Sequence, residues 1–95
     1  THNFLKAIFG QGVKINTFSL TEGKKAFAEL GCSVESVPGE NSTLVSFTLN
    51  DGTIVKLKFH NPHGHGDDKL YKALQRYFKR FCISIGKTPE NHQVK

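Results

Sequence analysis

Three histidines fall close together in the second half of the chain, at His60, His63 and His65. Imidazole titrates near neutral pH, so it can move the protons required when a 2′-hydroxyl attacks a phosphodiester. Such cleavage without a metal also needs cations around the phosphate. Lys56 and Lys58 alternate with His60 along one predicted strand, which places all three on the same face. We therefore take His60 as the candidate catalytic residue of a metal-independent endoribonuclease, with a loop of surface histidines as the alternative.

The same segment also raises the question of metal binding. His63-Gly64-His65 could hold a transition ion, and Asp67 or Asp68 could add an oxygen ligand. A structural zinc site normally shows four strong ligands at a recurring spacing, and this segment does not. The glycines around His65 also lack the spacing of a phosphate-binding loop. We therefore expect neither a bound metal nor a cofactor.

The chain is basic, with 13 Lys and Arg against 8 Asp and Glu, a formal net charge of +5 and a pI near 9.4. Excess positive charge attracts polyanions over long range. Cations at helical spacing near the C-terminus can address phosphates across a groove of A-form RNA, although an ordinary solvated helix face is the alternative. The candidate RNA-binding residues are Lys56, Lys58, His63, His65, Lys69, Lys72, Arg76, Lys79 and Arg80.

The clearest elements that could position these residues are two alternating segments, 42–49 and 53–60, rich in β-branched and aromatic residues. A three-residue loop between them, with Gly52 left-handed, pairs Phe47 with Val55 and keeps apolar residues on one face. A two-residue loop would mix the faces. The expected buried face carries Val45, Phe47, Val55, Leu57 and Phe59. The opposite face carries Ser42, Leu44, Ser46, Lys56, Lys58 and His60.

Helical patterns flank these strands. Ser19 and Glu22 form a capping-box pattern that opens a helix, and Gly31 ends it before a short strand over residues 32–37. Asp67 or Asp68 is expected to cap the last helix. Its predicted apolar stripe consists of Leu70, Ala73, Leu74, Tyr77 and Phe81, with Phe78 at the border.

This order predicts an α+β fold of α-β-β-β-α topology, in which two helices cover one face of a three-stranded antiparallel sheet. The other face stays open to solvent or a partner. Residues 1–18 are expected to be an N-terminal extension with a short apolar stripe, residues 19–85 the domain, and residues 86–95 a flexible tail.

Several classes of protein are disfavoured by the composition. No apolar run approaches the roughly 20 residues needed to span a bilayer, so no membrane segment is expected. Cys32 and Cys82 belong to no CxxC motif and predict free buried thiols in a reducing, cytoplasmic compartment. The two Tyr and eight Phe are expected mostly inside, which disfavours an aromatic platform for single-stranded RNA.

Residues 24–81 resemble the double-stranded-RNA-binding-domain fold and, in more detail, the HicA family of toxin ribonucleases. The residues that carry the resemblance are, in order, Phe27-Ala28-Glu29-Leu30-Gly31-Cys32, Gly39, Phe47, Asp51-Gly52 and Val55-Lys56-Leu57-Lys58-Phe59-His60. The resemblance implies RNA, structured or double-stranded, as the partner. It also implies a possible protein partner, because an antitoxin covers the open sheet face of such toxins.

One position departs from the HicA pattern. The catalytic histidine of the family follows Gly-Ser at the start of the middle strand. Counting back from Asp51-Gly52 places this position at Leu44, and counting forward from Gly39 places it at residues 41–43, none of which is histidine. The chain is thus a non-catalytic relative, a relative in which another histidine acts, or one with an engineered substitution. Its resemblance supports RNA contact more than RNA cleavage.

The alternative from another class is a protein-interaction module that uses the open sheet face, where Leu44 would suit such a contact. An accessory domain of a larger chain is a second alternative.

Overall fold

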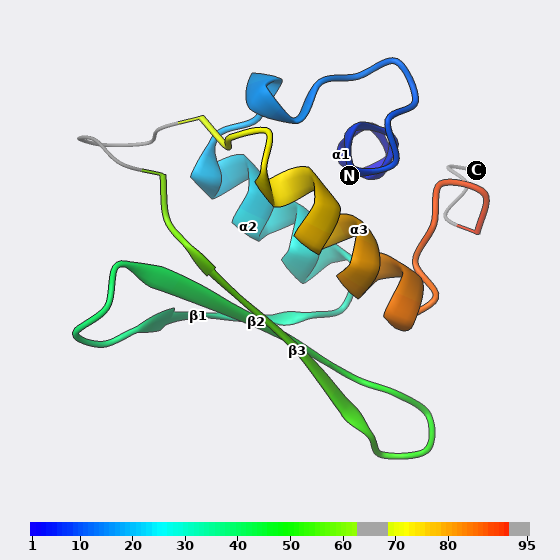
Figure 1. Ribbon diagram of the computed structural model, residues 1–95. Helices are drawn as coiled ribbons and strands as arrows, with labels where there is room; N and C mark the ends of the chain where they lie inside the picture. The colour runs from blue at the N-terminus through cyan, green and yellow to red at the C-terminus, as the bar shows by residue number, and fades with distance from the viewer. Residues whose placement is uncertain (63–68, 92–95) are drawn as a thin grey trace.

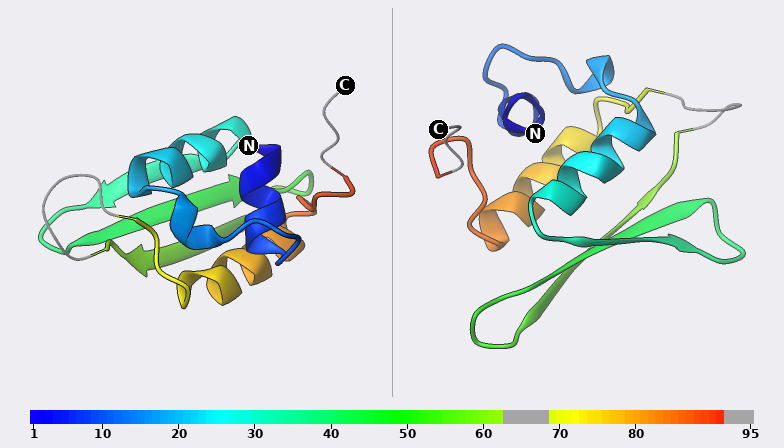
Figure 2. Two further views of the ribbon diagram at one scale, coloured as in Figure 1. Left: turned by 90° about the horizontal axis from the view of Figure 1, so that it is seen from above. Right: turned by 180° about the vertical axis from the view of Figure 1, so that it is seen from behind.

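The computed structural model describes residues 1–62 and 69–91 (Figure 1). The strands form one antiparallel sheet in the order β1-β2-β3. Helices α2 and α3 lie side by side over one face of this sheet, and α1 packs on them from the far side (Figures 1 and 2). The predicted α+β fold is confirmed, with α1 as a third helix. The elements are α1 (His2–Ile8), the 3-10 turn η1 (Ile15–Thr17), α2 (Leu20–Glu29), β1 (Ser33–Val37), β2 (Ser42–Thr48), β3 (Ile54–His60) and α3 (Leu74–Ser84).

The β2–β3 hairpin has the predicted register. Phe47 pairs with Val55 across the two strands, and the pairing continues in step to their ends. Gly52 has a φ of 90°, in the left-handed region that glycine adopts without strain. The Asp51 carboxylate accepts a hydrogen bond from the Thr53 amide at 2.9 Å, which holds the pKa of Asp51 below its ordinary value. The turn chemistry therefore sets which side chains reach each face.

Helix α2 begins and ends as its sequence predicts. The Ser19 hydroxyl accepts the Glu22 amide at 3.2 Å, and the Glu22 carboxylate accepts the Ser19 amide at 2.9 Å. This capping box satisfies two amides that would otherwise lack a partner. Gly31 follows the helix with a φ of 94° and lets the chain turn directly into β1.

The N-terminal segment is part of the core. Phe4, Leu5, Ala7 and Ile8 are almost completely buried, and α1 contacts α3 and η1. Residues 1–18, expected from the sequence to be an extension, thus share one hydrophobic core with the remainder of the domain.

Phe78 is the centre of that core. Its ring lies 5.1 Å from Phe27 of α2, 5.0 Å from Phe59 of β3 and 6.1 Å from Phe4 of α1, measured between centroids. Two of these contacts are edge-to-face, an arrangement that adds stability beyond the area buried. One side chain of α3 therefore joins α1, α2 and the sheet.

The last helix starts later than predicted, and its predicted apolar stripe is confirmed only in part. Leu70, Leu74 and Phe81 are buried, whereas Ala73 and Tyr77 are exposed. Helix α3 begins at Leu74, because the preceding segment pairs with the chain ahead of α2: the Leu70 amide donates to the Phe18 carbonyl at 2.9 Å, and Lys69 bridges Ser19. The buried stripe consequently contains Phe78, and Tyr77 is 55% exposed. Asp67 and Asp68, the expected caps, lie outside the described residues.

The inner face of the sheet is buried unevenly. Val45 and Phe59 are buried, while Phe47, Val55 and Leu57 are only half-buried. The tip of the hairpin extends beyond the helices, so they cover only the near part of these strands (Figure 1).

Alanine substitutions at two adjacent residues of α3 test this packing. Phe78→Ala should lower the free energy of unfolding by about 3–5 kcal/mol, because it empties the centre of the aromatic cluster. Its neighbour Tyr77→Ala should change stability by no more than about 0.5 kcal/mol. Urea denaturation measures both. Equal losses would contradict the observed orientation of α3.

Candidate nucleic-acid interface

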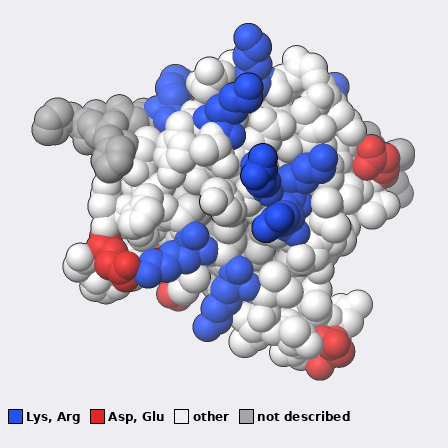
Figure 3. All heavy atoms as spheres, in the orientation of Figure 1, with Lys and Arg blue, Asp and Glu red and all other residues white. Residues whose placement is uncertain are grey.

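Five exposed cations cover one side of the molecule. Arg76, Lys79 and Arg80 project from the outer face of α3, while Lys69 and Lys72 lie in the segment before it rather than on the helix as predicted. Figure 3 shows Lys and Arg side chains gathered over α3, with acidic side chains only toward the edges of this view. We call these five residues the basic face.

The basic face has no acidic partner among the residues that the structure describes. No Asp or Glu occurs in the sequence between Lys69 and Pro89. Within residues 1–62 and 69–91, no carboxylate lies in ion-pair distance of a basic-face residue. Lys79 instead places its ammonium 5.8 Å from the ring centroid of Phe9. These charges are therefore available to an anionic ligand.

The predicted lysines of β3 lie on the open face of the sheet. Lys58 forms an ion pair with Glu40 at 2.6 Å, and both side chains are about half exposed, so the pair contributes little to stability. Lys56 is exposed and has no carboxylate partner among the described residues. Of these two lysines, only Lys56 offers an unpaired charge.

His60 ends β3 on the same open face. Its Nδ1 atom shares a hydrogen bond of 3.1 Å with the Oγ atom of Ser42, which is 1% exposed and lies directly across from it on β2. This contact orients the imidazole and leaves Nε2 outside the bond. An exposed Nε2 can exchange a proton with a bound ligand.

The backbone around His60 is held by polar contacts at the end of the sheet. The Thr43 hydroxyl donates to the Asn61 side chain at 2.6 Å, and the Asn61 amide donates to the Asn41 carbonyl at 2.8 Å. The Tyr71 hydroxyl donates to the His60 carbonyl at 3.1 Å. Together these bonds hold the C-terminal end of β3 against β2 and against the segment that precedes α3.

Leu44 lies on the open face, as its register predicts. It pairs with Lys58 on β3 and Glu35 on β1 and is partly exposed. It thus shares a sheet face with His60 and lies two residues along β2 from Ser42, the partner of His60. Its side chain can neither donate nor accept a proton.

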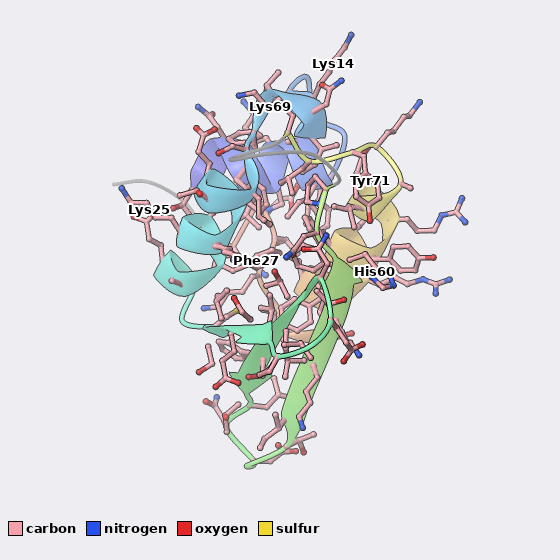
Figure 4. All side chains as sticks on the ribbon, turned by 90° about the vertical axis from the view of Figure 1, so that its left-hand side faces the viewer. Lys14, Lys25, Phe27, His60, Lys69 and Tyr71 are labelled. Atoms are coloured by element: carbon pink, nitrogen blue, oxygen red, sulfur yellow. The ribbon has the colours of Figure 1, made fainter. Side chains whose placement is uncertain are left out.

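Both tyrosines reach the surface, contrary to the expectation that they would be inside. Tyr71 is 39% exposed and Tyr77 55% exposed. Burial raises the pKa of Tyr71, and the nearby Tyr77 phenol raises it further. In Figure 4, Tyr71 and His60 lie on the side of α3, and Lys25 lies on the side of α2.

The other predicted histidines cannot be placed. His63 and His65 lie outside the described residues, as do Asp67 and Asp68. Within the part of the chain that is described, no group of three or more His, Cys, Asp or Glu side chains could hold a metal ion.

Neither cysteine is a nucleophile in this fold. Cys32 and Cys82 are both free and buried. Burial raises the pKa of Cys32 to about 11, although Lys87 opposes this rise. Burial also raises the pKa of Cys82 to about 12, with a further contribution from Cys32. The interpretation of Cys82 as a core residue is confirmed.

Comparison of the chain with protein-family models, with curated proteins and with solved structures found no match. In residues 1–62 and 69–91, no helix has both the length and the apolar character required to cross a membrane. The fold and its surface define a small α+β domain with one basic face and a histidine at its margin.

The two thiols should react slowly while the protein is folded. A rise in pKa from 9.0 to about 11 lowers the thiolate fraction at mildly alkaline pH about 100-fold. Mass spectrometry after iodoacetamide treatment should therefore show at least that much protection relative to protein unfolded in urea. Rapid labelling of either cysteine in the folded protein would contradict its assignment to the core.

Proposed function

We propose that this chain is an RNA-binding domain that contacts the phosphates of structured RNA through its basic face. The observation that carries the proposal is a run of exposed cations that, within residues 1–62 and 69–91, has no carboxylate in ion-pair distance. Cations that are already paired gain little from a new anion, whereas unpaired ones release condensed counterions when they bind phosphates. Arg76 and Arg80 stand one helical turn apart, about 6 Å along the axis, so α3 presents a row of donors rather than a single point charge.

The two arginines of α3, Arg76 and Arg80, further support phosphate binding. The guanidinium group offers several donors in a planar fork that fits phosphate oxygens, and two of the three α3 cations are arginines. Their helix is fixed to the core through Phe78, so little ordering is needed on binding. The α-β-β-β-α arrangement is also the one that a resemblance to HicA ribonucleases implies, which supports RNA as the ligand.

The proposal concerns binding rather than cleavage. By the resemblance to the HicA family, the catalytic histidine would fall at Leu44 or at residues 41–43, and none of these residues is a histidine. The alkyl group of Leu44 cannot act as a base. His60 is the remaining described candidate, because its Nε2 atom is exposed while Nδ1 contacts Ser42.

A protein partner on the open sheet face is the second candidate function. Ile54 on this face is 57% exposed at the hairpin end, and Leu44 is partly exposed near the other end of the strands, where it pairs with Lys58. These apolar side chains are few and lie among Lys56, Lys58 and Glu35, which favours the RNA proposal over this one.

Charge reversal tests the proposed function. Affinity for a duplex and for a hairpin RNA should fall as salt rises, with a log–log slope of roughly −0.7 to −0.9 per phosphate contacted. The double variant Lys72→Glu/Arg76→Glu should weaken binding to both RNAs alike and reduce that slope by about 2. Lys25→Glu is the matched control, because this exposed lysine lies on α2, away from the basic face. Fluorescence anisotropy measures all three proteins.

An affinity that is indifferent to salt and to the double substitution would contradict the proposal. The absence of binding to every RNA tested, with an intact fold by circular dichroism, would favour the protein-partner function instead.

A cleavage assay separates an enzyme from a binder. We expect weak or no cleavage by the wild-type chain. Any cleavage that occurs should fall about 10²–10⁴-fold in His60→Ala, because the loss of a general base has an effect of this size. RNA affinity should remain nearly unchanged in the same variant. Full activity in His60→Ala would show that another residue is the base.

A further inference from the structure

Two exposed tyrosines, Tyr71 and Tyr77, lie among the cations near His60, and phosphate binding by these cations does not account for them. Of the aromatic side chains in the described residues, Tyr71 and Tyr77 are the two that are strongly exposed, whereas the phenylalanines are buried or partly buried. Exposed rings of this size lose hydrophobic stabilisation unless a ligand covers them. Both belong to the basic segment that the proposed function assigns to phosphates.

The fold fixes the Tyr71 ring by a hydrogen bond and the Tyr77 backbone by its place on α3. The hydroxyl of Tyr71 donates to the His60 carbonyl at 3.1 Å, which ties its ring to the end of β3. Tyr77 stands on α3 directly before the buried Phe78, so its backbone cannot rotate without disrupting the aromatic cluster. A preorganised ring loses less conformational entropy on binding than a mobile side chain.

Each tyrosine borders a shallow hollow that is also lined by cations, Lys69 beside Tyr71 and Lys72, Arg76 and Lys79 beside Tyr77. Tyr71 borders a depression that it shares with His60, Pro62 and Lys69. Tyr77 borders a second shallow hollow that continues along α3, lined also by Lys72, Ala73, Gln75, Arg76 and Lys79. No described carboxylate lines either hollow. An aromatic ring for a base, beside cations for its phosphate, is the combination by which proteins hold unpaired nucleotides.

We propose that Tyr71 and Tyr77 stack on unpaired bases, so that the preferred ligand is an RNA with a single-stranded loop or tail next to the phosphates bound by the basic face. This inference rests on the proposed RNA-binding function and narrows its substrate class. A perfect duplex hides its base faces in the helical stack and cannot use these rings. A hydrophobic peptide would leave the surrounding cations without partners, and an acidic peptide would leave the rings uncovered.

Binding to two matched RNAs tests the inference. One is a blunt hairpin closed by a very short loop, and the other is the same hairpin with a short single-stranded 3′ tail. The wild-type chain should bind the tailed RNA more tightly, by about 5- to 150-fold for one stacked base. Tyr77→Leu should remove most of this preference and leave affinity for the blunt hairpin unchanged, while Tyr77→Phe, which keeps the ring, should retain the preference.

Tyrosine fluorescence gives a second test, which does not require the Tyr77→Leu variant to fold. The chain has two Tyr and no Trp, so its emission reports on these two rings alone. In Tyr71→Phe, Tyr77 is the single remaining fluorophore. Titration with a short oligouridylate should quench its emission at the concentration at which the oligonucleotide binds.

The outcomes separate this inference from the function on which it rests. Equal affinity for the blunt and tailed hairpins, or a tail preference that survives Tyr77→Leu, would overturn the stacking site and leave the RNA-binding function standing. Unquenched Tyr77 emission in a saturated complex would overturn it as well. Absence of binding to both hairpins, with a folded protein, would overturn the RNA-binding function itself.

Discussion

The contact of Phe78 with Phe4, Phe27 and Phe59 is the interaction on which the remaining structure depends. A chain of this length can bury only a limited area, so its few large rings must serve several elements at once. Phe78 does so, because one ring on α3 touches α1, α2 and β3. The contact fixes both the position of α3 above the sheet and its rotation about its own axis. Among the ring–ring contacts of the described residues, no other aromatic side chain joins α3 to α1, α2 and β3 at once.

The rotation of α3 decides the character of the surface. With Phe78 inward, Arg76 and Arg80 lie roughly 160° away on the opposite side of the helix, and Tyr77 and Lys79 lie roughly 100° to either side. All four side chains are exposed. The basic face and the exposed Tyr77 are thus consequences of the aromatic core. A helix rotated by one residue would bury Tyr77 and separate it from the cations.

The groups that remain at the surface limit the chemistry of this domain. Burial keeps the thiols of Cys32 and Cys82 protonated, which removes the two strongest nucleophiles. Ammonium and guanidinium groups, two phenols and one imidazole are left on the side of α3. Ammonium and guanidinium groups bind phosphate, and phenol rings stack on bases.

Local signals in the sequence determined the sheet and α2. The alternation of residues 42–60 with Gly52 fixed the register, and Ser19 with Glu22 fixed the start of a helix, because these interactions join residues close in sequence. The Ser42 contact of His60, the burial of α1 and the start of α3 were decided only by the tertiary structure. Leu70 bonds to Phe18, more than fifty residues away, and this pairing replaces the first turn that the sequence pattern predicts. A helical periodicity counts every residue in its run, so it could not show that residues 69–73 lie outside the helix. Nor could it show that Tyr77 faces solvent and Phe78 the core.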